Sequence, residues 1–239
     1  MNNLKIKEIN NAKLDPVYVS VYILKNTYKI YKNSVKEDDT FYTVIGVNLK
    51  NQKHILYMTH QKSSEVRMWI DIFERLKQRG VNEIIFLSSL EDKNIKKALR
   101  ISYPCAKFTP SLVELTEILY RYTPLRSNRD VFCKLRKLYL AETIEDYKEN
   151  AKSFDDFFNN PIQIAIKEKY LRNVEAIYNI PYKLRLLIYS GYKNLEYYNE
   201  LRLFFSNQIF LNIDDLYSKL ENSFIDDFIT CSFSKNEWT

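Results

Sequence analysis

The stretch FYTVIGVNLKNQKHILYMT at residues 41–59 consists of two short segments separated by a polar turn. Residues 41–47 form an apolar run of the kind found in strands that are buried on both faces. Residues 53–59 are predicted to form the next strand. Because only residues 49–52 lie between the two segments, we expect them to pair as antiparallel neighbours.

Upstream of this pair, residues 17–23 alternate in the way a strand does, with four β-branched residues on one face. These residues are Val17, Val19, Val21 and Ile23. Residues 28–31 either continue this strand or begin another. Residues 34–39, SVKEDD, are interpreted as a charged turn, and residues 1–14 as a polar lead-in without regular structure.

Downstream, apolar residues recur at i, i+3, i+4, i+7 and i+10, which predicts an amphipathic helix. They are Val66, Trp69, Ile70, Phe73 and Leu76. Ser63 and Ser64 offer an N-cap for this helix. Gly80 is predicted to end it, as the residue that follows the C-cap.

Residues 84–87, IIFL, predict a second kind of strand, which is short, continuous and buried on both faces. Residues 93–102 follow as a predicted helix that ends before Pro104. Three antiparallel strands, a helix, a strand and another helix define an α/β fold.

From residue 110 to residue 181 no strand is predicted. Helical patterns cover residues 111–122, 128–141, 144–158 and 162–178. Thr143 and Asp146 are predicted to pair at the start of the third helix of this region. Residues 206–239 are mixed, with a helix expected near 214–228.

The composition indicates a packed protein, because 46% of its 239 residues are hydrophobic. The net charge is +6, and residues 1–100 carry 18 Lys and Arg against 11 Asp and Glu. Such an excess permits contact with phosphate backbones. The three cysteines are far apart, which favours neither a zinc site nor a disulfide framework. No signal-peptide core or run of 18 apolar residues occurs, so we expect a cytoplasmic protein without a membrane partner.

Several short segments have the residues and the order of one known family. They are V-I-G-V-N at 44–48, Trp69 with L-K-x-R-G-V at 76–81, Ala98 with Tyr103-Pro104, LYLAET at 138–143, and Tyr178 to Tyr189 with Pro181 and Arg185. Over roughly residues 17–220 the chain therefore resembles the Mutator-type transposases of bacterial insertion sequences.

Residues 183–202, KLRLLIYSGYKNLEYYNELR, extend this likeness to the family segment I-Y-T-T-N-x-x-E-x-x-N-x-x-L-R. Ile188-Tyr189 and Leu201-Arg202 match it at equal spacing. The family's glutamate falls on Leu195, however, and Glu196 lies one residue later.

The resemblance implies a ribonuclease H-like mixed sheet with flanking helices and a large all-helical insertion. The expected parts are a lead-in at 1–16, the first part of the core at 17–109, the helical insertion at 110–181, a core return helix at 182–205 and a C-terminal helical tail at 206–239. Only about 16 residues precede the first strand, so the chain is expected to be shortened at its N-terminus and to lack the family's N-terminal DNA-binding region.

The family's enzymes are DDE transposases, in which three carboxylates hold two divalent metal ions. Here the equivalent positions are Ser20, Leu90 and Leu195, and the family's C-x-x-H falls on Ser111 and Glu114. Displaced candidates for the carboxylates are Glu91, Asp92 and Glu196. The alternative is that these residues have no functional role and are solvated acids near helix starts, where the helix dipole favours them.

Three functions stay open from the sequence. The first is a degenerate, catalytically inactive transposase, and the second is an active enzyme that uses Mg²⁺ with the displaced carboxylates. The third is a non-catalytic module that binds DNA, pairs with intact transposase or forms a homo-oligomer. DNA binding is expected to be weak and non-specific, with Arg185, Lys193 and Arg202 as candidate contacts. His54 and His60 are interpreted as surface residues of a strand and a turn.

Overall fold

The computed structural model describes residues 4–61, 63–89, 92–111, 115, 118–119, 121–122, 128–155, 161–162, 164–165, 168, 178, 181–183, 185 and 203–223. The chain divides into two compact units. The first comprises Met1–Leu87, Asp92–Lys107 and Glu196–Thr239, and the second comprises Ser88–Glu91 and Phe108–Leu195.

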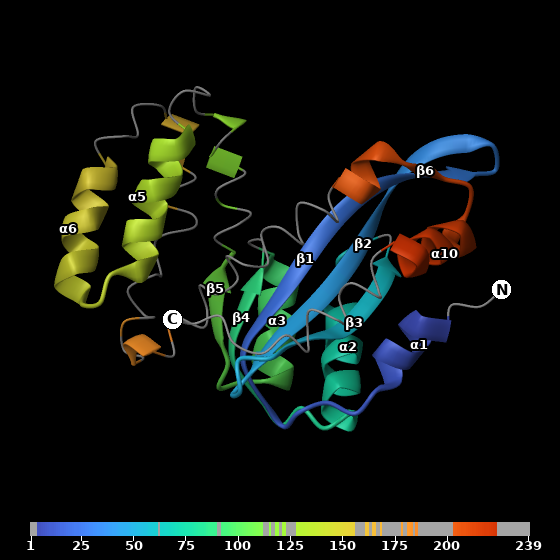
Figure 1. The fold of residues 1–239 in the computed structure, drawn as a ribbon, viewed down its shortest axis with the longest axis horizontal. Coiled ribbons are helices and arrows are strands. Elements are labelled where there is room, and N and C mark those ends of the chain that lie inside the picture. The colour runs from blue at the N-terminus through green and yellow to red at the C-terminus, as the bar shows by residue number, and fades with distance from the viewer. Residues whose placement is uncertain are drawn as a thin grey trace. The chain divides into compact units, whose positions relative to one another are not determined.

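The sheet is built around three long antiparallel strands, β1 (Val17–Lys32), β2 (Val35–Asn48) and β3 (Lys53–Gln61). The strand order is β3-β2-β1-β4-β5, and β6 pairs with β1 in parallel. The shorter strands are β4 (Glu83–Ser89), β5 (Lys107–Pro110) and β6 (Ile209–Phe210). Figure 1 shows β1 and β2 running side by side along their length. The strands predicted at 17–23 and 84–87 lie side by side as β1 and β4, and the fold is a mixed α/β one.

The predicted charged turn at residues 34–39 is wrong, because residues 35–39 belong to β2. The hairpin turns at Asn33 and Ser34 instead, both of which have positive φ angles, +50° and +66°, as tight hairpin turns require. The charged residues that suggested a loop lie opposite partners on β1. Lys29 pairs with Asp38 in the register, and their side chains form an ion pair of 3.0 Å. Such cross-strand pairs let charged residues occupy a strand.

The predicted unstructured lead-in is also wrong, because residues 4–11 form helix α1 (Leu4–Asn11). The Asn10 side chain holds α1 on β3, donating to the Met58 carbonyl at 2.8 Å and accepting from the Met58 N–H at 2.9 Å. This is the pattern of contacts that a neighbouring strand would make. A single asparagine therefore gives a polar, weakly helical segment a fixed place.

Helices α2 (Val66–Gln78) and α3 (Lys93–Ser102) form where the apolar periodicity predicted them. Gly80 follows the C-cap of α2 with φ +114°, a conformation that favours glycine. The predicted N-cap at Ser63 or Ser64 is wrong. Glu65 occupies the N-cap position without a side-chain hydrogen bond, because the Ser64 hydroxyl is engaged elsewhere, as described below.

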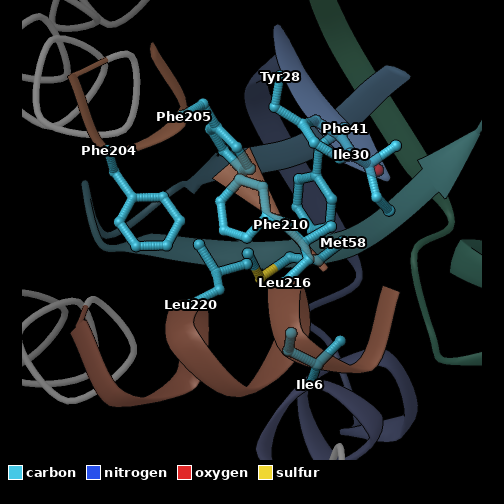
Figure 2. Close-up of a cluster of buried hydrophobic side chains, with 10 residues drawn as sticks. All are labelled: Ile6, Tyr28, Ile30, Phe41, Met58, Phe204, Phe205, Phe210, Leu216 and Leu220. Atoms are coloured by element: carbon cyan, nitrogen blue, oxygen red, sulfur yellow. The ribbon is translucent and has the colours of Figure 1, made fainter. Parts of the chain in front are cut away.

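The part of the β1–β2 hairpin that includes Tyr28, Ile30 and Phe41 packs into an aromatic cluster with the C-terminal part of the chain, as Figure 2 shows. Tyr28 and Phe41 of the sheet meet Phe205 and Phe210 at ring-centroid distances of 5.4–5.6 Å. Helix α10 (Ile213–Ser223) adds Leu216 and Leu220. The helix expected near 214–228 is confirmed for 213–223, whereas strand β6 was not predicted.

The second unit contains helices α5 (Asn128–Leu140) and α6 (Ile144–Asp155). The predicted pairing of Thr143 and Asp146 begins α6. Both the N–H and the hydroxyl of Thr143 donate to Asp146 Oδ2, and the Asp146 N–H donates to the Thr143 hydroxyl at 3.0 Å. The predicted helices at 111–122 and 162–178 fall largely outside the described residues.

The glycine of the V-I-G-V-N segment is required by packing. A Cβ at Gly46 would lie 2.5 Å from Tyr18 Cδ1 and 2.8 Å from Leu56 Cδ1, and Tyr18 and Leu56 are fully buried. We expect Gly46→Ala to destabilise the protein by about 1–3 kcal/mol, as overpacking of a core does. Urea unfolding measures this. In a Tyr18→Leu background the same change should cost less, since the clash is with the ring; an equal cost would contradict the explanation.

Candidate functional site

Strands β1 and β4, which carry or precede the first two expected catalytic positions in the sequence, begin together. The N–H groups of Asn82 and Glu83 both donate to the Pro16 carbonyl, at 2.8 and 3.0 Å. At the other end of β4 the Ser89 carbonyl accepts from the Ser111 N–H at 3.0 Å. Ser111 is the position at which the family's cysteine was expected, so that residue follows β5 directly.

Ser20 occupies the position expected for the first carboxylate and is fully buried in β1. It pairs with Val47 of β2, and the register shifts between Tyr18 and Ser20. Its hydroxyl finds no hydrogen-bond partner within the described part of the chain. Ser88 and Ser89 at the end of β4 are buried as well. Ser20, Ser88 and Ser89 are therefore small, neutral and buried.

Asp92, one of the displaced candidates, is the N-cap of α3. Its Oδ1 accepts from the N–H groups of Asn94 and Ile95, at 2.7 and 3.3 Å. Its Oδ2 accepts from the Ser64 hydroxyl at 2.6 Å. Both carboxylate oxygens are thus engaged in holding the start of a helix, a common task of aspartate.

The same network reaches the core through Trp69. The indole Nε1–H donates to Ser64 Oγ at 2.8 Å, and the Asn94 side chain donates to the Ser64 carbonyl. Ser64 accepts from Trp69 and donates to Asp92, so it joins the beginnings of α2 and α3. This is why Ser64 does not cap α2, and it explains the tryptophan at this position of the family pattern.

Six of the other predicted site residues lie outside the described residues. They are Leu90, Glu91, Lys193, Leu195, Glu196 and Arg202.

Arg185, predicted as a DNA contact, lies in the second unit and is 2% exposed. Its guanidinium donates to the carbonyls of Ala141, at 2.9 Å, and Glu142, at 2.5 Å, in the turn between α5 and α6. It also lies over the ring of Tyr178, 4.2 Å from the centroid. Burial raises the pKa of Tyr178 to about 12, although the arginine acts in the opposite direction. Arg185 in this arrangement stabilises the helix pair.

Beside the same turn lies an open cavity of about 510 Å³. Its lining includes Arg136, Lys137, Glu142 and Asp146. Charges of both signs line it, so the cavity has no single electrostatic preference.

The sequence interpretation missed the partners of both histidines. His60 is not a surface residue: its side chain is 13% exposed, and its Nε2 lies 2.7 Å from Asp39 Oδ2. The Lys32 ammonium donates to the same carboxylate oxygen, and the Thr40 N–H donates to the other at 2.8 Å. The register that places Phe41 opposite His60 would have revealed the pair, but residues 34–39 were assigned to a turn.

The environment of Asp39 keeps it ionised. Desolvation raises the pKa of this carboxyl, but hydrogen bonds from Lys32, His60 and Thr40 outweigh that effect and lower it below the usual value. The buried Tyr28 ring lies edge-on to His60. Burial and, to a smaller extent, the negative charge of Asp39 raise the pKa of Tyr28. Asp39 is therefore a buried ion-pair centre shared by three strands.

His54 belongs to a second polar group at the start of β1. Its Nδ1 lies 3.0 Å from the Tyr18 hydroxyl and 3.5 Å from Asp15 Oδ2. Desolvation lowers the pKa of His54, and Asp15 opposes that change. Burial raises the pKa of Tyr18 to about 12. The Asn48 amide donates to Asp15 Oδ2 at 2.8 Å, so this group closes the β2–β3 turn against β1.

Two observations bear on a metal site. The described residues contain no group of three or more His, Cys, Asp or Glu side chains that could hold a metal ion. Ser20, at the first expected position, offers a buried hydroxyl, and Asp92, a displaced candidate, caps a helix with its carboxylate. Both are poor ligands for Mg²⁺, which prefers several free carboxylate or water oxygens. These two residues therefore do not fit the metal that the resemblance implied.

Comparison with known proteins defines the class. The transposase for insertion sequence element IS1201 of Lactobacillus helveticus is 21% identical over 194 residues, which cover 78% of this chain and 51% of that protein. The transposase for insertion sequence element ISRM3 of Rhizobium meliloti (strain 1021) is 21% identical over 188 residues, covering 77% and 47%. The chain thus spans about half the length of the curated relatives it matches.

The model of the family described as "Transposase, Mutator family" matches residues 3–200. The chain belongs to the Mutator family of transposases. Among solved structures, the Drosophila P element transposase strand transfer complex matches 50% of this chain and 32% of its own, with a TM-score of 0.33 and 11% identity. Within the described residues, no helix has the length and apolar character needed to cross a membrane.

The Asp39 centre predicts acid sensitivity. Folding lowers the pKa of Asp39. The stability that this residue contributes is therefore fully present above its pKa in the unfolded state, about 3.9, and is lost as the pH falls through its lower pKa in the folded state. At pH 7 we expect Asp39→Asn to cost on the order of 2 kcal/mol, since it weakens bonds from Lys32 and His60. The free energy of unfolding, measured with urea from pH 7 down to pH 3, should fall less steeply with decreasing pH in this variant than in the parent.

Asp38→Asn is the matched control. Its side chain is 65% exposed and pairs with Lys29, which is 54% exposed, so the change should stay within about 0.5 kcal/mol. Equal losses in the two variants would contradict a special role for Asp39.

Proposed function

We propose that this chain is a ribonuclease H-like transposase core that contacts DNA weakly and does not cleave it. The observation that carries the proposal is Ser20, a fully buried neutral residue at the place of the first carboxylate. The strand order β3-β2-β1-β4-β5, with three antiparallel strands followed by helix-linked β4 and β5, supports the ribonuclease H-like assignment. Residues 110–181, which include α5 and α6, are the proposed helical insertion.

The requirements of a two-metal site explain why position 20 matters. A two-metal site needs carboxylates that converge so that the ions sit about 3.5–4 Å apart. A serine hydroxyl supplies no charge to such a site, and Ser20 is closed off from solvent. At the other two expected positions, Leu90 and Leu195 offer apolar side chains. Mg²⁺ is accordingly not assigned as a cofactor of this chain.

The alternative of an active enzyme depends on Glu91 or Asp92 acting with Glu196. The hydrogen bonds of Asp92 argue against its part, because ligating a metal would remove the cap of α3 and the partner of Ser64. Glu196 lies one residue past the expected place, which on a helix turns a side chain by roughly 100°. A non-catalytic partner of intact transposase, or a homo-oligomer, is compatible with the same geometry.

Catalysis is tested directly by a cleavage and strand-transfer assay on labelled DNA duplexes with Mg²⁺ or Mn²⁺. We expect no product from the parent chain. Glu196→Gln is the companion variant: activity in the parent that disappears in Glu196→Gln would show that the displaced glutamate is a working ligand and that the proposal is wrong.

Restoring a carboxylate at position 20 tests the site without requiring activity. Ser20→Asp buries an unpaired charge and should destabilise the protein by several kcal/mol, whereas Ser20→Asn introduces a side chain of the same size without charge. We expect 10 mM Mg²⁺ or Mn²⁺ to leave the melting temperature of both variants unchanged. A metal-dependent rise confined to Ser20→Asp would mean that other carboxylates converge there, against the proposal.

A further inference from the structure

Helix α3 has an outer face that carries only positive charge. Its exposed residues Lys93, Lys97 and Arg100 recur at i, i+4 and i+7, so they fall within roughly 60° of helix surface at about 100° per residue. The opposite face is buried through Ile95 and Leu99 among others. No Asp or Glu occurs between residues 93 and 102.

The other exposed helices of this unit mix their charges. In α2, Arg67 pairs with Asp71 at 3.2 Å and Lys77 with Glu74 at 2.8 Å. In α10, Lys219 pairs with Asp215 at 3.0 Å. Among the ion pairs formed within the described ranges, none includes Lys93, Lys97 or Arg100. The face of α3 therefore differs from an ordinary solvated helix surface, where opposite charges alternate.

The acid closest in sequence is committed elsewhere. Asp92 gives one oxygen to the amides of Asn94 and Ile95 and the other to Ser64. The cap also fixes the first turn of α3 to the start of α2, and the two helices lie side by side in Figure 1. The three cations are consequently presented by a helix that is held at its N-terminus and along its buried face.

We propose that this outer face of α3 binds the phosphate backbone of duplex DNA, an inference that rests on the DNA contact included in the proposed function. From Lys93 to Arg100 the helix rises about 10 Å at 1.5 Å per residue. Phosphates of one strand of B-DNA follow one another every 3.4 Å along the axis, so the face spans about three of them. Lysine and arginine contacts to phosphates position a protein on DNA without reading its sequence.

The surface lies close in sequence to an expected catalytic position. Three residues, 90–92, separate the end of β4 from the start of α3, and the family's second carboxylate is expected at the first of them. A duplex held along α3 would therefore contact the helix that directly follows this position in the chain. The surface thus accounts for retained DNA contact in a chain whose proposed catalytic positions are neutral.

The test compares two triple variants of the full chain that each remove three positive charges. One is Lys93→Gln, Lys97→Gln and Arg100→Gln. The control is Lys7→Gln, Lys36→Gln and Lys50→Gln, which changes three exposed lysines on other elements. Fluorescence anisotropy with a labelled duplex of arbitrary sequence gives the binding constant between about 20 and about 200 mM NaCl, roughly the range over which binding through phosphate contacts weakens most clearly. Circular dichroism checks that both variants remain folded.

We expect the α3 variant to bind at least tenfold more weakly than the parent at low salt. The slope of log K against log salt should fall by about 2–3, because each lost phosphate contact removes about 0.9. The control should change affinity less than threefold. Equal losses in both variants would mean that net charge alone attracts DNA, and would overturn the α3 site while leaving DNA binding intact. A parent chain that does not bind the duplex even at low salt would overturn both the site and the DNA contact of the proposed function.

Discussion

One guanidinium group holds together the parts of the first unit that meet at the beginning of the sheet. Arg79, at the C-cap of α2, donates to the carbonyls of Ile9 and Ala12 at 2.6 and 2.8 Å and to that of Leu56 on β3. Desolvation lowers its pKa, yet an arginine stays charged in proteins. The next residues extend the junction: the Arg79 carbonyl accepts from Leu14, and Gly80 turns the chain so that β4 begins beside β1. Without this cation three carbonyls would lose their donor, and the loss is costly at the buried residue Leu56.

The residues that carry the family resemblance are, in this structure, largely residues that build the frame. Gly46 makes room for the ring of Tyr18, and Asn48 accepts from the backbone of the β2–β3 turn while donating to Asp15. The Tyr103 hydroxyl donates to the Val81 carbonyl, and Arg185 donates to the turn between α5 and α6. Each satisfies a backbone group or a packing limit that few other residues could. This explains how a likeness can persist at 21% identity.

Local periodicity predicted the elements whose burial follows from their own sequence. Strands at 17–23, 41–47 and 53–59 and helices at 66–76 and 93–102 were found because their apolar faces are regular. It failed where long-range pairing decides. Residues 35–39 are charged and become strand only through their partners on β1, and the two residues of β6 depend on pairing with Lys29 and Ile30. For the site, counting along the sequence proposed Ser20 and, as a displaced candidate, Asp92, but no local pattern could show that Asp92 caps α3 or that Asp39 binds His60.

The energetics of a carboxylate cluster connect these observations. Carboxylates that converge in a buried site repel one another and are desolvated, so without bound metal they cost stability. A chain with Ser20 in β1 does not carry that cost at this position, and it leaves one unpaired hydroxyl, a smaller penalty than an unpaired charge. Asp92, in turn, adds stability as a cap. Ser20 and Asp92 are therefore both compatible with a stable frame that holds no metal, and a frame of this kind can carry a cationic surface such as that of α3.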